Sequence, residues 1–261
     1  MSLEHPLSLL LALAAAAIAG AINAIAGGGT LVAFPAIVGL GVTPLVANAT
    51  TTVALWPGSV GSMWGYRNEL AGARSWALRF ALPSLLGGAT GALLLLRTSA
   101  DRFERVVPYL VLAATLLFMA QGPIARRLGR KTGDTAMTNA DLPPPPVGYL
   151  VYQFFVGVYG GYFGAGIGIL MLAVLGAMGL TNIHQMNGLK NLGALVINAV
   201  AAALFALSGI VRWPIAIAMA VGGLLGGYGG AVLAQRVPQI WVRRAITCVG
   251  LMAFVWLLVR R

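Results

Sequence analysis

The chain has 261 residues, of which 59% are apolar and only 9% are charged, and its formal net charge is +11. No Asp, Glu, Lys or Arg occurs from Leu7 to Tyr66 or from Val147 to Leu189, so we expect an all-α polytopic membrane protein. Such long apolar runs exclude a β-barrel, and basic residues placed between them flank membrane segments, which excludes nucleic acid as a partner.

Ten apolar segments follow one another along the chain. They run over residues 7–26, 30–40, 45–66, 76–96, 103–121, 147–163, 169–180, 185–208, 213–234 and 240–259. The first segment lacks the Lys or Arg that precedes a secretory signal, so we expect it to be retained. Segments 30–40 and 169–180 are too short to span a membrane, and each follows a glycine cluster that permits a tight reversal. We therefore interpret 7–40 and 147–180 as broken helices or re-entrant hairpins.

Residues 122–146 are predicted to form a linker between two transmembrane repeats, 1–121 and 147–261. The linker is basic and ends in four prolines, which favour an extended chain. The two halves align at an offset of 139 residues, which pairs Gly27 with Gly166, Gly29 with Gly168, Asn48 with Asn187, Arg97 with Arg236 and Arg105 with Arg244. A hairpin plus three crossings in each half is an odd number, so the repeats are predicted to be inverted.

The distribution of basic residues predicts the orientation in a cell inner membrane. Ten Lys and Arg residues fall on the side of the linker and six on the other side. By the positive-inside rule the linker is expected to be cytoplasmic, with both termini outside.

Lys190 is the only Lys or Arg placed well inside an apolar segment. The acidic residues all lie at segment ends or in predicted loops: Glu4, Glu69, Asp101, Glu104, Asp134 and Asp141. Because no carboxylate within the membrane can neutralise Lys190, a permeating anion would fit as its partner. Snorkelling of the lysine to the interface is the alternative.

Two long segments carry polar stripes with the spacing i, i+4, i+11, which lies on one helical face. One stripe is Asn48, Thr52 and Ser59, and the other is Asn187, Asn191 and Asn198. Amides and hydroxyls donate hydrogen bonds to oxyanions, and broken helix ends attract negative charge. We expect one substrate-binding cavity formed by Lys190, Asn187, Asn191, Asn48, Thr51, Thr52, Thr30, Gly28, Gly29, Gly166 and Gly168. The alternative role of the stripes is hydrogen bonding between helices.

Groups suited to catalysis are few. The chain has two histidines and one cysteine, Cys248, and no acidic residue at membrane depth. A nucleophile–base set or a metal site is hard to assemble from these, so we expect no enzyme, no catalytic residue, no metal and no cofactor.

The glycine and asparagine motifs resemble the TauE/SafE sulfite-exporter family over nearly the whole chain outside 122–146. In the first half they are Gly27–Gly29 with Leu31 and Pro35, the run Asn48–Thr52, and Gly87-Gly88 with Gly91-Ala92. In the second half they are Gly164–Gly168, Asn187–Asn191, and Gly226-Gly227 with Gly230-Ala231, without a counterpart of Pro35.

This resemblance implies a permease for a small sulfur-containing anion, namely sulfite, an organosulfonate or a related carboxylate. The expected partners are that anion and the lipid bilayer, and a homodimer is compatible with this reading. With the cell interior negative, export could run on the membrane potential alone. A passive anion channel that uses the same residues is the alternative.

Overall fold

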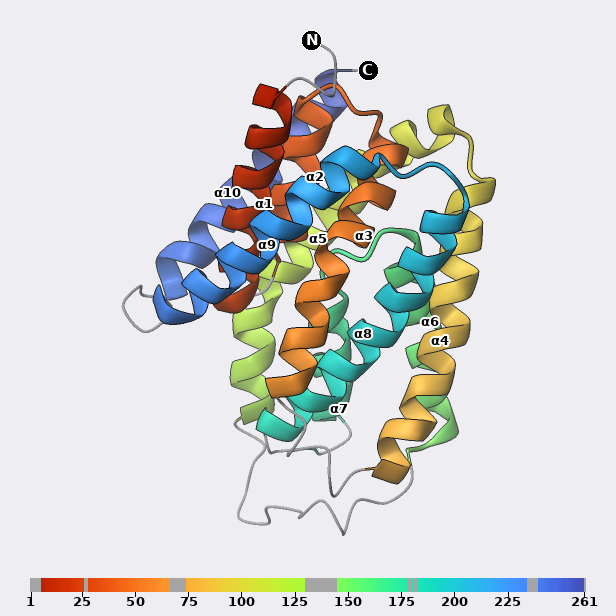
Figure 1. Cartoon of the computed structure of the whole chain (residues 1–261). Helices are drawn as coiled ribbons and strands as arrows, with labels where there is room; N and C mark the ends of the chain where they lie inside the picture. Colours follow the sequence, from red (N-terminus) through yellow and green to blue (C-terminus); the bar gives the residue numbers. More distant parts are fainter. Residues whose placement is uncertain are drawn as a thin grey trace.

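The computed structural model describes residues 6–25, 28–65, 74–129, 145–177, 180, 183–233 and 239–260. Within these ranges the chain forms helices and no strand, so the predicted all-α fold is confirmed (Figure 1). The helices are α1 Pro6–Ile25, α2 Thr30–Gly39, α3 Pro44–Gly65, α4 Arg74–Arg97, α5 Ala100–Gly129, α6 Val147–Tyr162, α7 Ile167–Ala177, α8 Ile183–Leu207, α9 Trp213–Leu233 and α10 Gln239–Val259.

Four of the described helices contain a stretch long and apolar enough to cross a membrane. These stretches are Pro6–Asn23, Trp76–Arg97, Ala100–Ala120 and Gln185–Leu207. Large apolar side chains on the outer faces, such as Leu10, Leu82 and Leu225, are exposed rather than buried. Exposed apolar surface of this extent suits contact with lipid. The protein is therefore a membrane protein built from helices.

Both predicted helix breaks are confirmed. α1 ends at Ile25 and α2 begins at Thr30, while α6 ends at Tyr162 and α7 begins at Ile167. Gly28 has φ +89°, and Gly164 and Gly166 both have φ +84°. Glycine adopts such dihedrals without the steric cost that a Cβ imposes, which explains why each break falls on a glycine cluster. Gly27 lies outside the described residues.

The predicted linker is shorter than expected at its start. α5 continues to Gly129, eight residues beyond the predicted end of its apolar segment at residue 121. The run after Gly122-Pro123 is Ile-Ala-Arg-Arg-Leu, whose residues mostly favour helix, so local propensity extends α5 past the apolar region. Residues 130–144 lie outside the described part of the chain.

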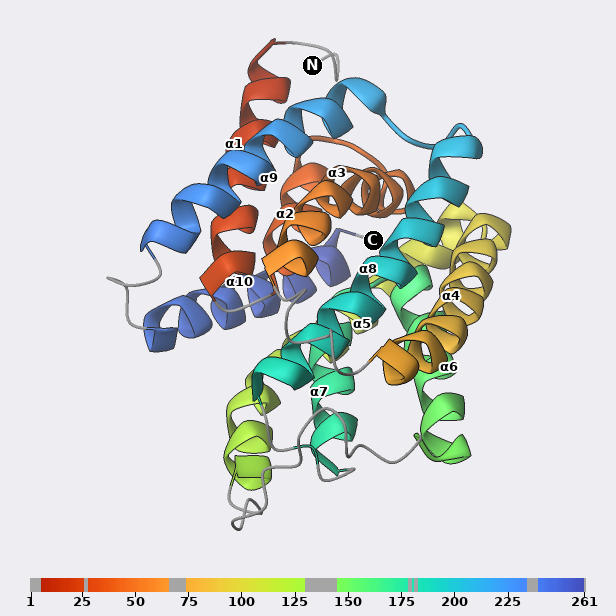
Figure 2. The same cartoon turned by 60° about the horizontal axis from the view of Figure 1, so that its bottom comes forward.

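Helix packing follows the same scheme in the two halves. α1 packs closely on α9, and α6 packs closely on α4. Both crossings use glycine: Gly226 abuts the carbonyl of Ala17, and Gly87, its equivalent at the offset of 139, abuts the carbonyl of Phe154. Figure 2 shows α3 and α8 between these two outer pairs. In each pair a helix of one half packs on a helix of the other half, as two inverted repeats require. The inverted relation between the halves remains a prediction.

The helix ends separate into two groups at opposite ends of the molecule. The start of α1 and the end of α10 lie together at one end, whereas the end of α3, the start of α4, the end of α5 and the start of α6 lie at the other (Figure 1). The helices next to the basic segment 67–79 and the linker 122–146, two of the three segments whose positive charge predicts a cytoplasmic location, therefore have these ends on one side, away from the start of α1 and the end of α10.

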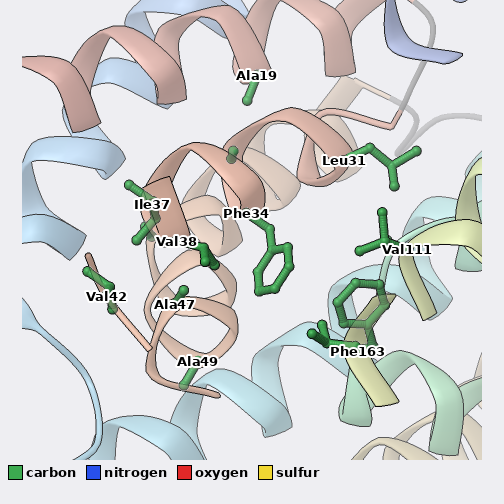
Figure 3. Close-up of a cluster of buried hydrophobic side chains, with 14 of the residues drawn as sticks. Ala19, Leu31, Phe34, Ile37, Val38, Val42, Ala47, Ala49, Val111 and Phe163 are labelled. Atoms are coloured by element: carbon green, nitrogen blue, oxygen red, sulfur yellow. The ribbon is translucent and has the colours of Figure 1, made fainter. Parts of the chain in front are cut away.

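The two helix breaks meet in the core. Phe34 of α2 contacts Phe163 of the second break edge-on, with ring centroids 5.5 Å apart and an interplanar angle of 85° (Figure 3). Both side chains are buried, at 1% and 2% exposure. An edge-to-face pair holds its two rings in a defined geometry. This contact holds α2, which begins directly after the first break, against the second break and positions the residues described next.

Candidate functional site

A polar pocket of about 80 Å³ lies between the two helix breaks, α3 and α8. None of the described residues that line it is ionisable, and most of its surface belongs to hydroxyl, amide, indole and backbone groups. The lining residues are Asn23, Thr30, Thr51, Thr52, Leu55, Trp56, Ser59, Phe163, Gly164 and Asn198. Both halves of the chain therefore contribute to one uncharged, hydrogen-bonding cavity.

A larger hollow lies elsewhere, on the surface of α10. Its volume is about 500 Å³, and it is lined by Leu251, Met252, Val255, Trp256 and Val259. All five residues come from one helix, and they offer almost no polar surface. A binding site needs a few convergent polar groups, so the smaller pocket is the candidate site.

The first break presents Asn23 and Thr30 to the pocket. The backbone N–H of Gly29 donates to Asn23 Oδ1 at 2.8 Å, which fixes the amide of Asn23. Because Oδ1 is occupied, the Nδ2 group of Asn23 is the donor left for the pocket. Thr30 is the first residue of α2, where the helix dipole favours negative charge.

Three consecutive threonines of α3 have different environments. Thr50 Oγ1 accepts the backbone N–H of Arg212 at 3.1 Å, and Thr52 Oγ1 donates to the carbonyl of Asn48 at 2.9 Å. Thr51 lies between them, 1% exposed, and its Oγ1 has no hydrogen-bond partner within the described structure. Thr51 is therefore the one member of the run with a buried hydroxyl available to a ligand in the pocket.

The indole of Trp56 is the second such donor. Its Nε1 is buried and has no partner among the residues described. Leaving a buried donor unpaired costs about 1–3 kcal/mol, and native proteins hold few such groups without a reason. Two of them lining one small pocket indicate a site that is completed by water or by a bound ligand.

The second break contributes Phe163, Gly164 and, beside it, Asn198 of α8. The hydroxyl of Tyr159 donates to the carbonyl of Ala165 at 2.8 Å and holds this break in shape. A Cβ placed at Gly164 would lie 3.9 Å from Asn198 Oδ1. The amide of Asn198 therefore faces the break and gives the second half its polar group in the pocket.

Three of the predicted site residues, Thr30, Thr51 and Thr52, lie together in this pocket. Asn48 lies outside its lining and is 2% exposed, and its Nδ2 donates to the carbonyl of Tyr162 at 3.0 Å. It joins α3 to the end of α6. Asn187 and Asn191 are half-buried on α8 and do not line the pocket.

The predicted glycines shape the breaks without lining the pocket. Gly28 lies against Phe118, Gly29 against Asn23 and the carbonyl of Ala19, and Gly166 near Ala114 of α5. These positions place α2 and α7 relative to their neighbours. The sequence therefore identified the residues that build the turns, and the cavity itself is lined by their neighbours.

Lys190 lies outside the pocket, on the same helix as Asn198. The two are eight residues apart, or about 12 Å along the helix axis. The stem of Lys190 crosses Gly168 of α7, since a Cβ placed at Gly168 would lie 3.1 Å from Lys190 Cδ. No carboxylate pairs with Lys190 within the described part of the chain.

The family model for the sulfite exporter TauE/SafE matches residues 12–257. The chain belongs to the TauE/SafE family. A probable membrane transporter protein of Haemophilus influenzae is 27% identical over 90% of this chain and 88% of its own length. The probable membrane transporter protein YfcA of Escherichia coli K12 is 28% identical over 94% of this chain and 87% of its own length. No solved structure matches the chain.

Membership of the TauE/SafE family makes this protein a membrane transporter and indicates a role in transport rather than catalysis. Two polar lining residues of this TauE/SafE protein, Asn23 and Trp56, were not predicted from the sequence, and neither were Leu55, Phe163 and Gly164. The two polar residues each carried a signal: Asn23 is the last polar residue of α1 before the break, and Trp56 precedes a proline within α3. Ser59 and Asn198 belonged to the polar stripes and were left out of the predicted site.

Proposed function

We propose that this protein exports a small sulfur-containing anion, namely sulfite, an organosulfonate or a related carboxylate, across the inner membrane, which it crosses several times. The pocket between the helix breaks is its binding site. The observation that carries the proposal is the pair of buried donors without partners, Thr51 Oγ1 and Trp56 Nε1, in an uncharged cavity. Family membership supports transport, and the donor groups support an anion.

The pocket has the chemistry to replace part of an anion's hydration shell. Hydroxyl, amide and indole groups donate hydrogen bonds, and bonds to a charged acceptor are stronger than those to a neutral one. Thr30 lies at the N-terminal end of α2, where the partial positive charge of the helix dipole attracts an anion. A monovalent anion that leaves a cell gains about 2.3 kcal/mol per 100 mV of membrane potential, so export needs no further energy source.

Lys190 has a separate part in this proposal. It is on the helix that carries Asn198, and its equivalent at the offset of 139 is Thr51, which lines the pocket. A positive charge on a residue two helical turns from Asn198 attracts an anion without holding it in the pocket. We place Lys190, with Asn187 and Asn191, along the route between the cytoplasm and the pocket.

Transport by purified protein in lipid vesicles tests the function. Efflux of sulfite and of a simple sulfonate is expected to saturate and to be stimulated by the same anion on the opposite side. Thr51→Val keeps the shape and removes the donor, so affinity should fall about 10- to 100-fold, the effect of losing roughly 1.5–3 kcal/mol from a hydrogen bond to a charged group.

Thr90→Val is the matched control for Thr51→Val. Thr90 is an exposed threonine of α4 whose hydroxyl donates to the carbonyl of Leu86 on its own helix, and its loss should leave transport unchanged. Flux that neither saturates nor responds to anion on the opposite side would identify a passive channel instead. If neither sulfite nor a sulfonate moves, the proposed substrate class is wrong.

A further inference from the structure

The charge of the bound anion is limited by what surrounds the pocket. The described parts of α1, α2 and α3 contain no Asp, Glu, Lys, Arg, His, Tyr or Cys. The helices α5 and α10 pack behind α2 and α3, and their described charged side chains lie near helix ends or toward the outer surface: Asp101, Arg102, Glu104, Arg105 and Arg244. Arg260, directly after α10, donates to the carbonyl of Val38 at the end of α2 remote from Thr30. Arg212, whose backbone N–H donates to Thr50 Oγ1 on α3, has an exposed side chain and does not line the pocket. The other titratable groups to consider are on α6 and α8.

The tyrosines of α6 are directed elsewhere. Tyr159 OH donates to the carbonyl of Ala165 at 2.8 Å, and Tyr162 OH lies 3.4 Å from Thr98 Oγ1. Tyr149 and Tyr152 are at least seven residues before Tyr159 on the same helix and do not line the pocket. On α8, Lys190 lies two turns from Asn198. Among the residues that the structure describes, no ionic group therefore lines the pocket to balance a second negative charge.

We propose that this site accepts an oxyanion only in its singly charged form, and that it rejects the dianion. The inference rests on the proposed function and specifies the substrate of that same site. The cost of removing an ion from water rises with the square of its charge, so a dianion costs about four times as much as a monoanion of the same size. The hydrogen bonds from neutral donors such as Thr51 Oγ1 and Trp56 Nε1 also become stronger with ligand charge, but their free energy rises far less steeply than the cost of desolvation.

The pocket also offers acceptors, which a protonated oxyanion needs. A singly protonated oxyanion carries one O–H, and Asn198 Oδ1 or the hydroxyl oxygen of Ser59 can accept it. A sulfonate carries its single charge without an O–H and needs donors alone. Both kinds of monoanion therefore match the groups present, and a cavity of about 80 Å³ limits the head group to a few heavy atoms.

Three probe anions separate charge from shape. Methanesulfonate is a monoanion from acidic to mildly alkaline pH, sulfate is a dianion over the same range, and sulfite loses its second proton near neutral pH. We would measure the binding of each to the purified full-length protein, by calorimetry across this pH range. Methanesulfonate should bind with one affinity throughout, and sulfate should bind at least about 100-fold more weakly.

The pH dependence of sulfite binding is the decisive measurement. If only the monoanion binds, its apparent affinity should fall about tenfold per pH unit above the second ionisation, since the competent fraction falls by that factor. Sulfite affinity that is flat or rises with pH, or sulfate binding as tight as that of methanesulfonate, would overturn the inference while leaving an anion transporter. Absence of binding by all three anions would overturn the proposed function and this inference together.

Two variants test where the charge acts. Ser59→Lys places an ammonium at the pocket and should raise sulfate binding relative to methanesulfonate at least about tenfold. Lys190→Gln should leave the ratio between these anions unchanged even if both are transported more slowly, because Lys190 is outside the pocket. A ratio that collapses in Lys190→Gln would place the lysine at the bound anion and contradict the inference.

Discussion

Helices α3 and α8 carry polar residues at equivalent positions, yet the structure uses them differently. Thr51, Thr52 and Ser59 of α3 all line the pocket, whereas α8 contributes Asn198 alone. At the position equivalent to Thr51, α8 has Lys190, whose stem lies over Gly168. The first half thus supplies most of the neutral donors, and the second half carries the charge. An ammonium inside the pocket would bind an anion tightly and slow its release, so this separation suits a transporter.

The two equivalent glycines at the starts of the short helices also have different neighbours. Gly29 and Gly168 are equivalent at the offset of 139. Gly29 lies against the backbone carbonyl of Ala19, and Gly168 lies against the side chain of Lys190. The first break is therefore rigidly enclosed by main chain, while the second faces a flexible stem. Glycine at the two equivalent positions therefore meets different local requirements.

The largest expected effect is the difference in stability between the alanine variants of these two glycines. In Gly29→Ala the new methyl group would collide with the Ala19 carbonyl and with Asn23, so we expect a loss at or above the upper end of the usual ~1–3 kcal/mol for overpacking. In Gly168→Ala the Lys190 stem can move aside, and the better helix propensity of alanine offsets the strain. Thermal unfolding of the purified proteins, together with their yield, measures the difference. Equal destabilisation of the two variants would contradict the comparison.

The second prediction concerns the charge on α8. Lys190→Ala should reduce the rate of anion transport about tenfold or more, because electrostatic attraction raises association rates by ~10–1,000-fold. The defect should be largest at low ionic strength and shrink as salt is added. Lys190→Arg should be partly tolerated, with a smaller loss than Lys190→Ala, because the guanidinium keeps the positive charge but differs from the ammonium in shape. Initial rates in vesicles at several salt concentrations measure this.

The control for that experiment is the folded state of the variant. Lys190→Ala should insert and unfold like the unmodified protein, because no carboxylate in the described structure depends on the lysine. Normal transport by Lys190→Ala at every salt concentration would show that the lysine only snorkels to the interface.

The sequence predicted the helices and their breaks well because membrane thickness limits the length of an apolar run and glycine marks its interruption. Each predicted segment agrees with a helix to within a few residues, apart from the extension of α5 to Gly129. The pocket was harder to predict. Helical spacing shows which residues share a face, as with Ser59 and Asn198, but it does not show what that face meets. Lys190 lies against Gly168, and Asn48 bonds the carbonyl of Tyr162. Both contacts depend on how the helices are tilted against one another, which is set by packing.

The smallest expected effect distinguishes the first asparagines of the two stripes. Asn48 is buried and donates to the carbonyl of Tyr162, so Asn48→Ala should lower the free energy of unfolding by about 0.6–1.7 kcal/mol, the range for hydrogen bonds between membrane helices. Its equivalent, Asn187, is half-buried, so Asn187→Ala should cost less stability. Anion affinity should be retained in Asn48→Ala, because Asn48 joins α3 to α6 without lining the pocket. A loss of affinity in Asn48→Ala at unchanged stability would instead make Asn48 a ligand and restore the symmetrical site that the two stripes predicted.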